Sequence, residues 1–99
     1  VVNNNGGGIF HFLPVAGHDD VFERYFGTPH GLDFEAAARQ FGVGYARPDS
    51  REDFEAAYRE ALAGGRTMLI EVVTDREENV RVHEQLLGEV RSSVGRANV

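Results

Sequence analysis

The chain has 99 residues, of which 41% are hydrophobic and 26% charged, as is typical of a folded domain rather than a disordered segment. Its net charge of −6 argues against a protein that binds a nucleic-acid backbone or an anionic membrane surface. The sequence has no cysteine, which excludes disulfides and thiolate chemistry, and no apolar run near the ~20 residues of a membrane span. We therefore expect a cytoplasmic protein with at most one small domain.

The chain opens with two valines that lead into three asparagines and three glycines. Val1 and Val2 have the character of a buried strand end, and residues 3–8 that of a polar turn. In open α/β sheets, ligands bind at the carboxyl ends of the strands. Asparagine tolerates the left-handed backbone region and glycine tolerates almost any conformation, so this turn can approach a ligand closely. The same composition also fits an ordinary turn after a strand, which is its commonest use.

The remaining elements alternate between helices and strands. We expect helices over residues 21–26, 34–41, 51–63 and from 76 to about 92, with strands at 43–46 and 67–73. Their candidate N-terminal caps are acidic or hydroxyl side chains: Asp20, Asp33, Ser50 and Asp75. Pro14 rules out a regular helix through residues 9–16. The nearly continuous apolar run at 67–73 predicts a buried parallel strand.

Apolar side chains at helical spacing predict which helix faces point inward. They are Phe34, Ala37, Ala38 and Phe41, then Phe54, Ala57, Tyr58, Ala61 and Leu62, and last Val80, His83, Leu86, Leu87 and Val90. Beyond the last helix, we expect residues 92–99 to fray.

The order of these elements predicts an α/β fold with a parallel sheet. With about three strands, the first of them cut short, the chain would form half of a doubly wound domain. Half a sheet leaves an unpaired edge and an uncovered apolar face. We therefore expect residues 1–99 to be a portion of a larger protein.

The run Asn3-Asn4-Asn5-Gly6-Gly7-Gly8-Ile9-Phe10-x-Phe12-Leu13-Pro14 resembles the second half of the thiamine diphosphate motif. Its form is that of the 2-succinyl-5-enolpyruvyl-6-hydroxy-3-cyclohexene-1-carboxylate synthases of menaquinone biosynthesis. The later stretch of residues 26–34 and the order of elements resemble that family too. The resemblance covers nearly the whole chain. It implies that the fold is the C-terminal part of a doubly wound, parallel-sheet domain that binds the diphosphate side of the cofactor.

The resemblance also implies a role for five residues. The side-chain oxygen of Asn4 and the backbone oxygen of Gly6 would bind Mg²⁺ or Mn²⁺, which would hold the diphosphate of the cofactor; oxygen ligands suit such hard cations. Ile9 and Phe10 would contact thiamine diphosphate, and with Leu13 they would line a dry substrate pocket. Ordinary core packing remains the alternative for these three apolar residues.

The activity that the resemblance implies is decarboxylation of 2-oxoglutarate and addition of the product to isochorismate, in a homodimer or homotetramer. The chain lacks the Gly-Asp element with the third metal ligand, the glutamate that contacts the aminopyrimidine ring, and the basic residues that recognise the substrates. Some relatives carry a polar side chain where this chain has Gly8. We therefore assign no catalytic residue and expect the 99 residues alone to be inactive.

Two other functions remain open. One is a different thiamine enzyme, of the acetolactate synthase or 2-oxo acid decarboxylase type. The other is a non-catalytic α/β interaction module that recruits a partner through its sheet edge. The 4 histidines, His11, His18, His30 and His83, show no zinc-ligand spacing, and we expect them to form hydrogen bonds.

Overall fold

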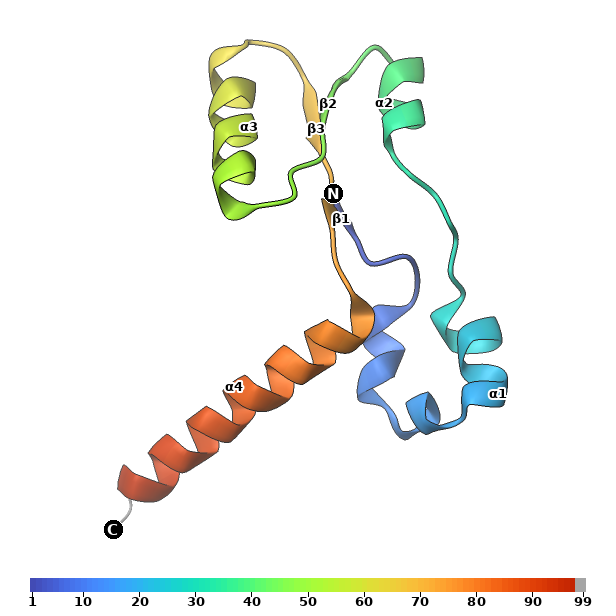
Figure 1. Cartoon of the computed structure of the whole chain (residues 1–99), viewed down its shortest axis with the longest axis vertical. Helices are drawn as coiled ribbons and strands as arrows, with labels where there is room; N and C mark the ends of the chain where they lie inside the picture. Colours follow the sequence, from blue (N-terminus) through green and yellow to red (C-terminus); the bar gives the residue numbers. More distant parts are fainter. Residues whose placement is uncertain (98–99) are drawn as a thin grey trace.

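The computed structural model describes residues 1–97, with short parallel strands at the centre and helices around them (Figure 1). The N-terminal third contains β1 (Val2–Asn3), the 3₁₀ helices η1 (Gly8–Phe12) and η2 (Pro14–Gly17), α1 (Asp19–Phe22) and the π-helical turn η3 (Glu23–Gly27). The rest contains α2 (Glu35–Gln40), β2 (Gly44–Ala46), α3 (Arg51–Ala63), β3 (Met68–Ile70), β4 (Val72–Val73) and α4 (Arg76–Ala97).

The strands pair in parallel around one extended segment made of β3 and β4. β2 pairs with β3, and β1 pairs with β4. The Glu71 N–H donates to the Ala46 carbonyl, whereas the Val72 N–H donates to the Val1 carbonyl, both at 2.9 Å. Because successive backbone groups of a strand face opposite edges, β1 and β2 lie on opposite sides of this segment. The predicted parallel strand at 67–73 therefore exists, but its pairing changes partner at Glu71. The expected burial was wrong: Val1, Val2 and Val73 are 53%, 73% and 49% exposed, and Met68–Ile70 are only partly buried.

Local sequence signals placed the middle helix correctly. α3 covers the predicted residues 51–63, and the Ser50 hydroxyl oxygen accepts the Asp53 N–H at 3.0 Å. Asp75 likewise accepts the Glu78 N–H at 2.8 Å and begins α4.

Three expectations about helix ends were wrong. Asp20 does not cap its helix: α1 begins one residue earlier, after His18, whose side chain makes no capping bond. α2 has Phe34 at its N-cap, and Asp33 instead accepts the Glu35 N–H at 3.0 Å. α4 continues to Ala97, so residues 92–97 are helical rather than frayed, and residues 98–99 lie outside the described part. A candidate cap residue does not by itself fix the first residue of a helix, because its side chain can bond a neighbouring N–H instead, and the C-terminal end depends on whether a breaker follows.

Little apolar surface is buried within the described residues. Phe22 and Ala38 are the only hydrophobic side chains there that are buried, at 4% and 2% exposure. Most of the predicted inward faces are exposed instead, including Ala37, Phe41, Phe54, Tyr58, Leu62, His83, Leu86, Leu87 and Val90. Partial burial is found at Phe34, Ala57, Ala61 and Val80.

The shape of the chain explains this exposure. α4 projects away from the strands as a single helix, with nothing beside its outer half (Figure 1). The radius of gyration is 18.2 Å, against about 13 Å for a compact domain of this length. The helix faces are apolar as predicted, but the described residues 1–97 form no second layer to cover them. Among residues 1–97, no helix combines the length and apolar character needed to cross a bilayer.

Candidate functional site

The asparagine–glycine turn follows directly from β1 and is held by its own side chains. The Asn3 side-chain oxygen accepts the Asn5 N–H at 3.0 Å, and the Asn4 side-chain oxygen accepts the Gly6 N–H at 3.2 Å. Asn5 and Gly6 have positive φ angles of 56° and 138°. Two overlapping Asx turns thus reverse the chain at the carboxyl end of β1.

Close packing against η3 requires the glycines of this turn. The Gly7 N–H donates to the Gly27 carbonyl at 2.7 Å, which brings the two backbones together. A Cβ on Gly6 would lie 2.0 Å from the Gly27 oxygen, and one on Gly7 would lie 2.3 Å from the Phe26 oxygen. A Cβ on Gly8 would lie 2.6 Å from the Asn4 amide nitrogen, so glycine here leaves space for the Asn4 side chain.

The three asparagines bond to different parts of the chain. Asn3 is 8% exposed, and its amide nitrogen donates to the Leu32 carbonyl at 3.1 Å. Asn5 accepts the Gly31 N–H at 2.8 Å. Within residues 1–97, the Asn4 side chain hydrogen-bonds only inside the turn. The outer asparagines therefore attach the turn to the loop before α2, whereas the Asn4 side chain takes no part in that attachment.

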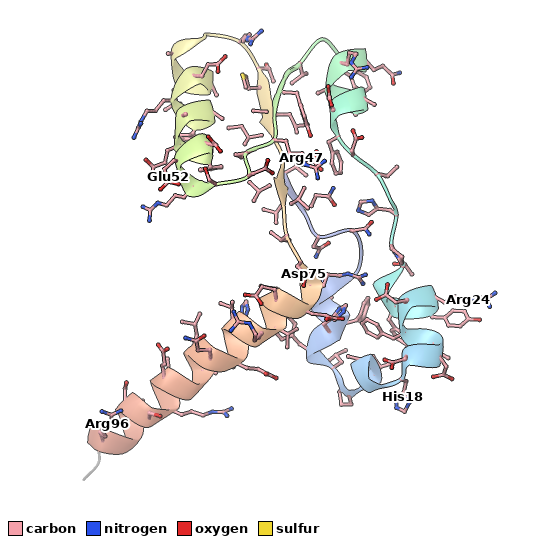
Figure 2. The ribbon with its side chains drawn as sticks, in the orientation of Figure 1. His18, Arg24, Arg47, Glu52, Asp75 and Arg96 are labelled. Carbon is pink, nitrogen blue, oxygen red and sulfur yellow. The ribbon has the colours of Figure 1, made fainter. Side chains whose placement is uncertain are left out.

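A buried carboxylate lies next to the turn. Glu71 is fully buried and accepts hydrogen bonds from the Asn3 amide at 2.7 Å, the Tyr45 hydroxyl at 2.5 Å and the Phe34 N–H at 3.3 Å. The hydrogen bonds from Tyr45 and Asn3 lower the pKa of Glu71, against the opposing effect of burial. Burial and then the bond to Glu71 raise the pKa of Tyr45 to about 12. Arg47, near the strands in Figure 2, adds a smaller favourable charge.

The three predicted pocket residues lie on or just after η1. Phe10 is partly buried, and its ring meets that of Phe26 edge-on at 5.6 Å between centroids. Ile9 is 74% exposed and Leu13 50% exposed. The turn and η1 are continuous, so all five predicted site residues lie in one stretch of chain. Phe10 packs within the chain, whereas Ile9 and Leu13 offer apolar surface outward.

A hollow with a volume of about 640 Å³ lies elsewhere, between β1, β4 and the start of α3. Its lining includes Val2, Phe54 and Val73, and none of the predicted site residues.

The histidines form local contacts. His30 accepts the Leu32 N–H at 2.9 Å, and His83 hydrogen-bonds the Asn79 carbonyl at 2.9 Å. The expected hydrogen bonding is confirmed for these two. The His11 ring lies 4.5 Å from that of Phe22, and His18 points outward beside α1 (Figure 2).

Sequence analysis missed two residues next to the turn. One is Glu71, whose signal was a single carboxylate inside an apolar strand. The other is Arg76, whose side chain is 13% exposed, packs against Gly27 and donates to Glu23 at 2.8 Å. Nothing in the local pattern distinguishes Arg76 from the other charged residues at the start of α4.

Comparison with known protein families identifies the domain that contains this turn and the strands around it. Residues 1–72 match the family model described as thiamine pyrophosphate enzyme, C-terminal TPP binding domain. The chain belongs to this family. Thiamine pyrophosphate is another name for thiamine diphosphate, so the predicted cofactor is confirmed, as is the predicted α/β fold class with parallel strands. The matched range includes the asparagine–glycine turn and Glu71, and ends before α4.

Individual relatives of this TPP-binding domain share one printed name, 2-succinyl-5-enolpyruvyl-6-hydroxy-3-cyclohexene-1-carboxylate synthase. The protein from Rubrobacter xylanophilus is 59% identical over 87 residues, which is 88% of this chain and 15% of the relative. The protein from Salinibacter ruber is 53% identical over 94 residues, 95% of this chain and 16% of the relative. The protein from Natronomonas pharaonis is 45% identical over 95 residues, which is 96% of this chain and 16% of the relative. The predicted resemblance is confirmed, and the chain spans about 15–16% of the length of these relatives.

Proposed function

We propose that this chain is part of a thiamine diphosphate- and Mg²⁺-dependent carboligase. The enzyme would decarboxylate 2-oxoglutarate and add the resulting succinyl-semialdehyde unit to isochorismate in menaquinone biosynthesis. The observation that carries the proposal is the agreement between the family match and a glycine-packed turn at the end of β1. Because the chain spans only 15–16% of its relatives, the activity requires the longer polypeptide and the 99 residues alone would be inactive.

The turn has the donor chemistry that a magnesium site needs. The Asn4 amide oxygen and the Gly6 carbonyl oxygen are hard, neutral donors, as Mg²⁺ prefers, and Mn²⁺ would accept the same pair. Within residues 1–97, both oxygens bond only to N–H groups inside the turn, those of Gly6 and Gly8. The missing side chains at Gly6 and Gly7 allow the turn to pack directly against the η3 backbone.

When bound, thiamine diphosphate supplies the electron sink that decarboxylation of a 2-oxo acid needs. The residues of this chain would bind and orient it. Asn4 and Gly6 would hold the metal ion that carries the diphosphate. Ile9, Phe10 and Leu13 would exclude water from the reacting carbon, because an apolar wall strengthens the electrostatic interactions inside the site.

The enzyme would be a homodimer or homotetramer, in which the rest of the polypeptide or a second copy would cover the apolar faces that residues 1–97 leave exposed. The outer half of α4 exposes Leu86, Leu87, Val90 and Val94, each at 52–58%. Exposed apolar patches of this kind mark interfaces more often than free surface.

The test uses the full-length enzyme with 2-oxoglutarate and isochorismate as substrates and Mg²⁺ as the varied component. Asn4→Ala is expected to raise the Mg²⁺ concentration needed for half-maximal product formation by about tenfold or more. Asn79→Ala removes the same side chain from the exposed surface of α4 and should leave that concentration unchanged.

Two results would contradict the proposal. Turnover of pyruvate in place of 2-oxoglutarate would favour an acetolactate synthase or decarboxylase. A full-length protein that binds no thiamine diphosphate would favour the interaction module.

A further inference from the structure

Glu71 joins three separate segments of the chain through hydrogen bonds. The donors are the Asn3 amide at the start of the turn, the Phe34 N–H before α2 and the Tyr45 hydroxyl on β2. The side chain is 0% exposed, although it lies between β3 and β4 in the central extended segment.

A buried carboxylate is costly at this position unless its hydrogen bonds are well made. Removing a charged group from water costs several kcal/mol unless hydrogen bonds replace the lost hydration. The neighbours Ile70 and Val72 are aliphatic, so Glu71 is the one charged residue inside this segment. A leucine in its place would avoid the cost of burying a charge, but it would leave the Asn3 amide, the Phe34 N–H and the Tyr45 hydroxyl without this acceptor.

The Asn3 side chain links Glu71 to the conformation of the turn. The Asn3 amide nitrogen is held by Glu71 at 2.7 Å and by the Leu32 carbonyl at 3.1 Å, so the orientation of the amide is fixed. The oxygen of the same amide then accepts the Asn5 N–H at 3.0 Å. Asn5 has a φ of 56°, in the left-handed region that asparagine tolerates, and this hydrogen bond helps to hold it there.

We infer that Glu71 is a positioning residue for the metal-binding turn. Through Asn3 it fixes the conformation of Asn5, and so the directions of the Asn4 amide oxygen and the Gly6 carbonyl. Glu71 itself contacts neither metal nor cofactor. The inference rests on the proposed function, because it assigns Glu71 a purpose in binding Mg²⁺.

The test measures Mg²⁺ binding by calorimetry on the full-length enzyme with thiamine diphosphate present, together with kcat at saturating Mg²⁺. Glu71→Met keeps the volume and removes all three hydrogen bonds, and should weaken Mg²⁺ binding about 10–100-fold, the usual effect of removing a group that orients a ligand. Glu71→Gln should weaken it less, because its carbonyl oxygen still accepts from Asn3. In both variants kcat should recover at saturating Mg²⁺.

Two further variants separate positioning from stability. Tyr45→Phe removes the hydroxyl bond to Glu71, so it should lower the melting temperature. Because it keeps the bond between Glu71 and Asn3, it should leave Mg²⁺ binding unchanged. Asn3→Ala breaks the same bond from the other side, and should weaken Mg²⁺ binding as Glu71→Met does. If Glu71→Met fails to fold, Asn3→Ala provides the same test. Glu60→Gln, on the exposed surface of α3, is the carboxyl-to-amide control.

The inference is overturned if the Glu71 and Asn3 variants bind Mg²⁺ like the wild type, whatever their melting temperatures. It is also overturned if kcat fails to recover with Mg²⁺. The Asn4→Ala variant separates the two proposals. Weaker Mg²⁺ binding in Asn4→Ala alone would refute only the role of Glu71, whereas no Mg²⁺ binding by the wild-type enzyme would refute the proposed function.

Discussion

Replacing Gly6 with alanine should disrupt the asparagine–glycine turn. The new Cβ would lie 2.0 Å from the Gly27 oxygen, so the two must separate by about 1.4 Å to reach the 3.4 Å of ordinary contact. That movement breaks the bond between the Gly7 N–H and the Gly27 oxygen, now 2.7 Å long, at a cost of about 0.5–1.5 kcal/mol. The φ of 138° costs an alanine about 1–3 kcal/mol more.

These terms together make the native turn about 1.5–4.5 kcal/mol harder to form in Gly6→Ala. If the turn relaxes and cofactor binding must restore it, affinity for thiamine diphosphate with Mg²⁺ should fall roughly 10- to 1,600-fold, at about 1.4 kcal/mol per factor of ten. Calorimetric titration of the full-length enzyme would measure this loss.

Gly17→Ala is the matched control, because a Cβ on Gly17 would meet nothing within 4 Å and its φ is not positive. Its cofactor affinity should equal that of the wild type. The steric reasoning would be refuted if Gly6→Ala also bound the cofactor within about threefold of the wild type, a difference of roughly 0.6 kcal/mol.

The remaining predictions concern stability, measured on the full-length enzyme. Ser50→Ala should lower the free energy of unfolding by about 0.5–2 kcal/mol through loss of the α3 cap, and Ser50→Thr should recover most of it in thermal denaturation. Gly88→Ala should stabilise α4 by about 0.5–1 kcal/mol, since nothing lies within 4 Å of its Cβ. The lowered pKa of Glu71 means that its stabilising contribution is present above its ordinary value of 4.5 and is lost as pH falls below it. The pKa of Tyr45, raised from 10.0 to about 12, means that its contribution is present below pH 10.0 and lost as pH rises toward 12. Urea unfolding across pH should show both losses, and Glu71→Gln should remove the acid one.

The sequence predicted the elements whose causes are local. α3 begins and ends where its cap and its two following glycines predict, because both signals act within one turn of the helix. The reversal after β1 follows from asparagine and glycine chemistry in the same way. The burial of helix faces was predicted poorly: Phe41 and Leu62 are 77% and 70% exposed. Periodicity shows that a face is apolar, but burial depends on a covering layer that this chain does not contain.

The hydrogen-bond partners of Glu71 could not be predicted from the local sequence either, because they lie far away along the chain. A carboxylate in an apolar strand predicts that something must satisfy it, but its donors come from positions 26 to 68 residues away. Only the parallel pairing of β1 and β2 on opposite sides of the central segment brings those donors together. The signal was visible in the sequence, but its partners required the fold.

The three asparagines have different hydrogen-bond partners, which separates the proposed metal ligand from its neighbours. Asn3 and Asn5 both bond toward the loop at residues 31–32, whereas Asn4 bonds within the turn and packs against Gly8. If the flanking asparagines are supports and Asn4 is the ligand, the same substitution should have different effects at positions 3 and 4. An aspartate at position 4 would still offer an oxygen to Mg²⁺. An aspartate at position 3 would place a second carboxylate against the buried Glu71, and one of the two would have to take up a proton. The same chemical change would therefore be tolerated at the proposed ligand and disruptive at its support.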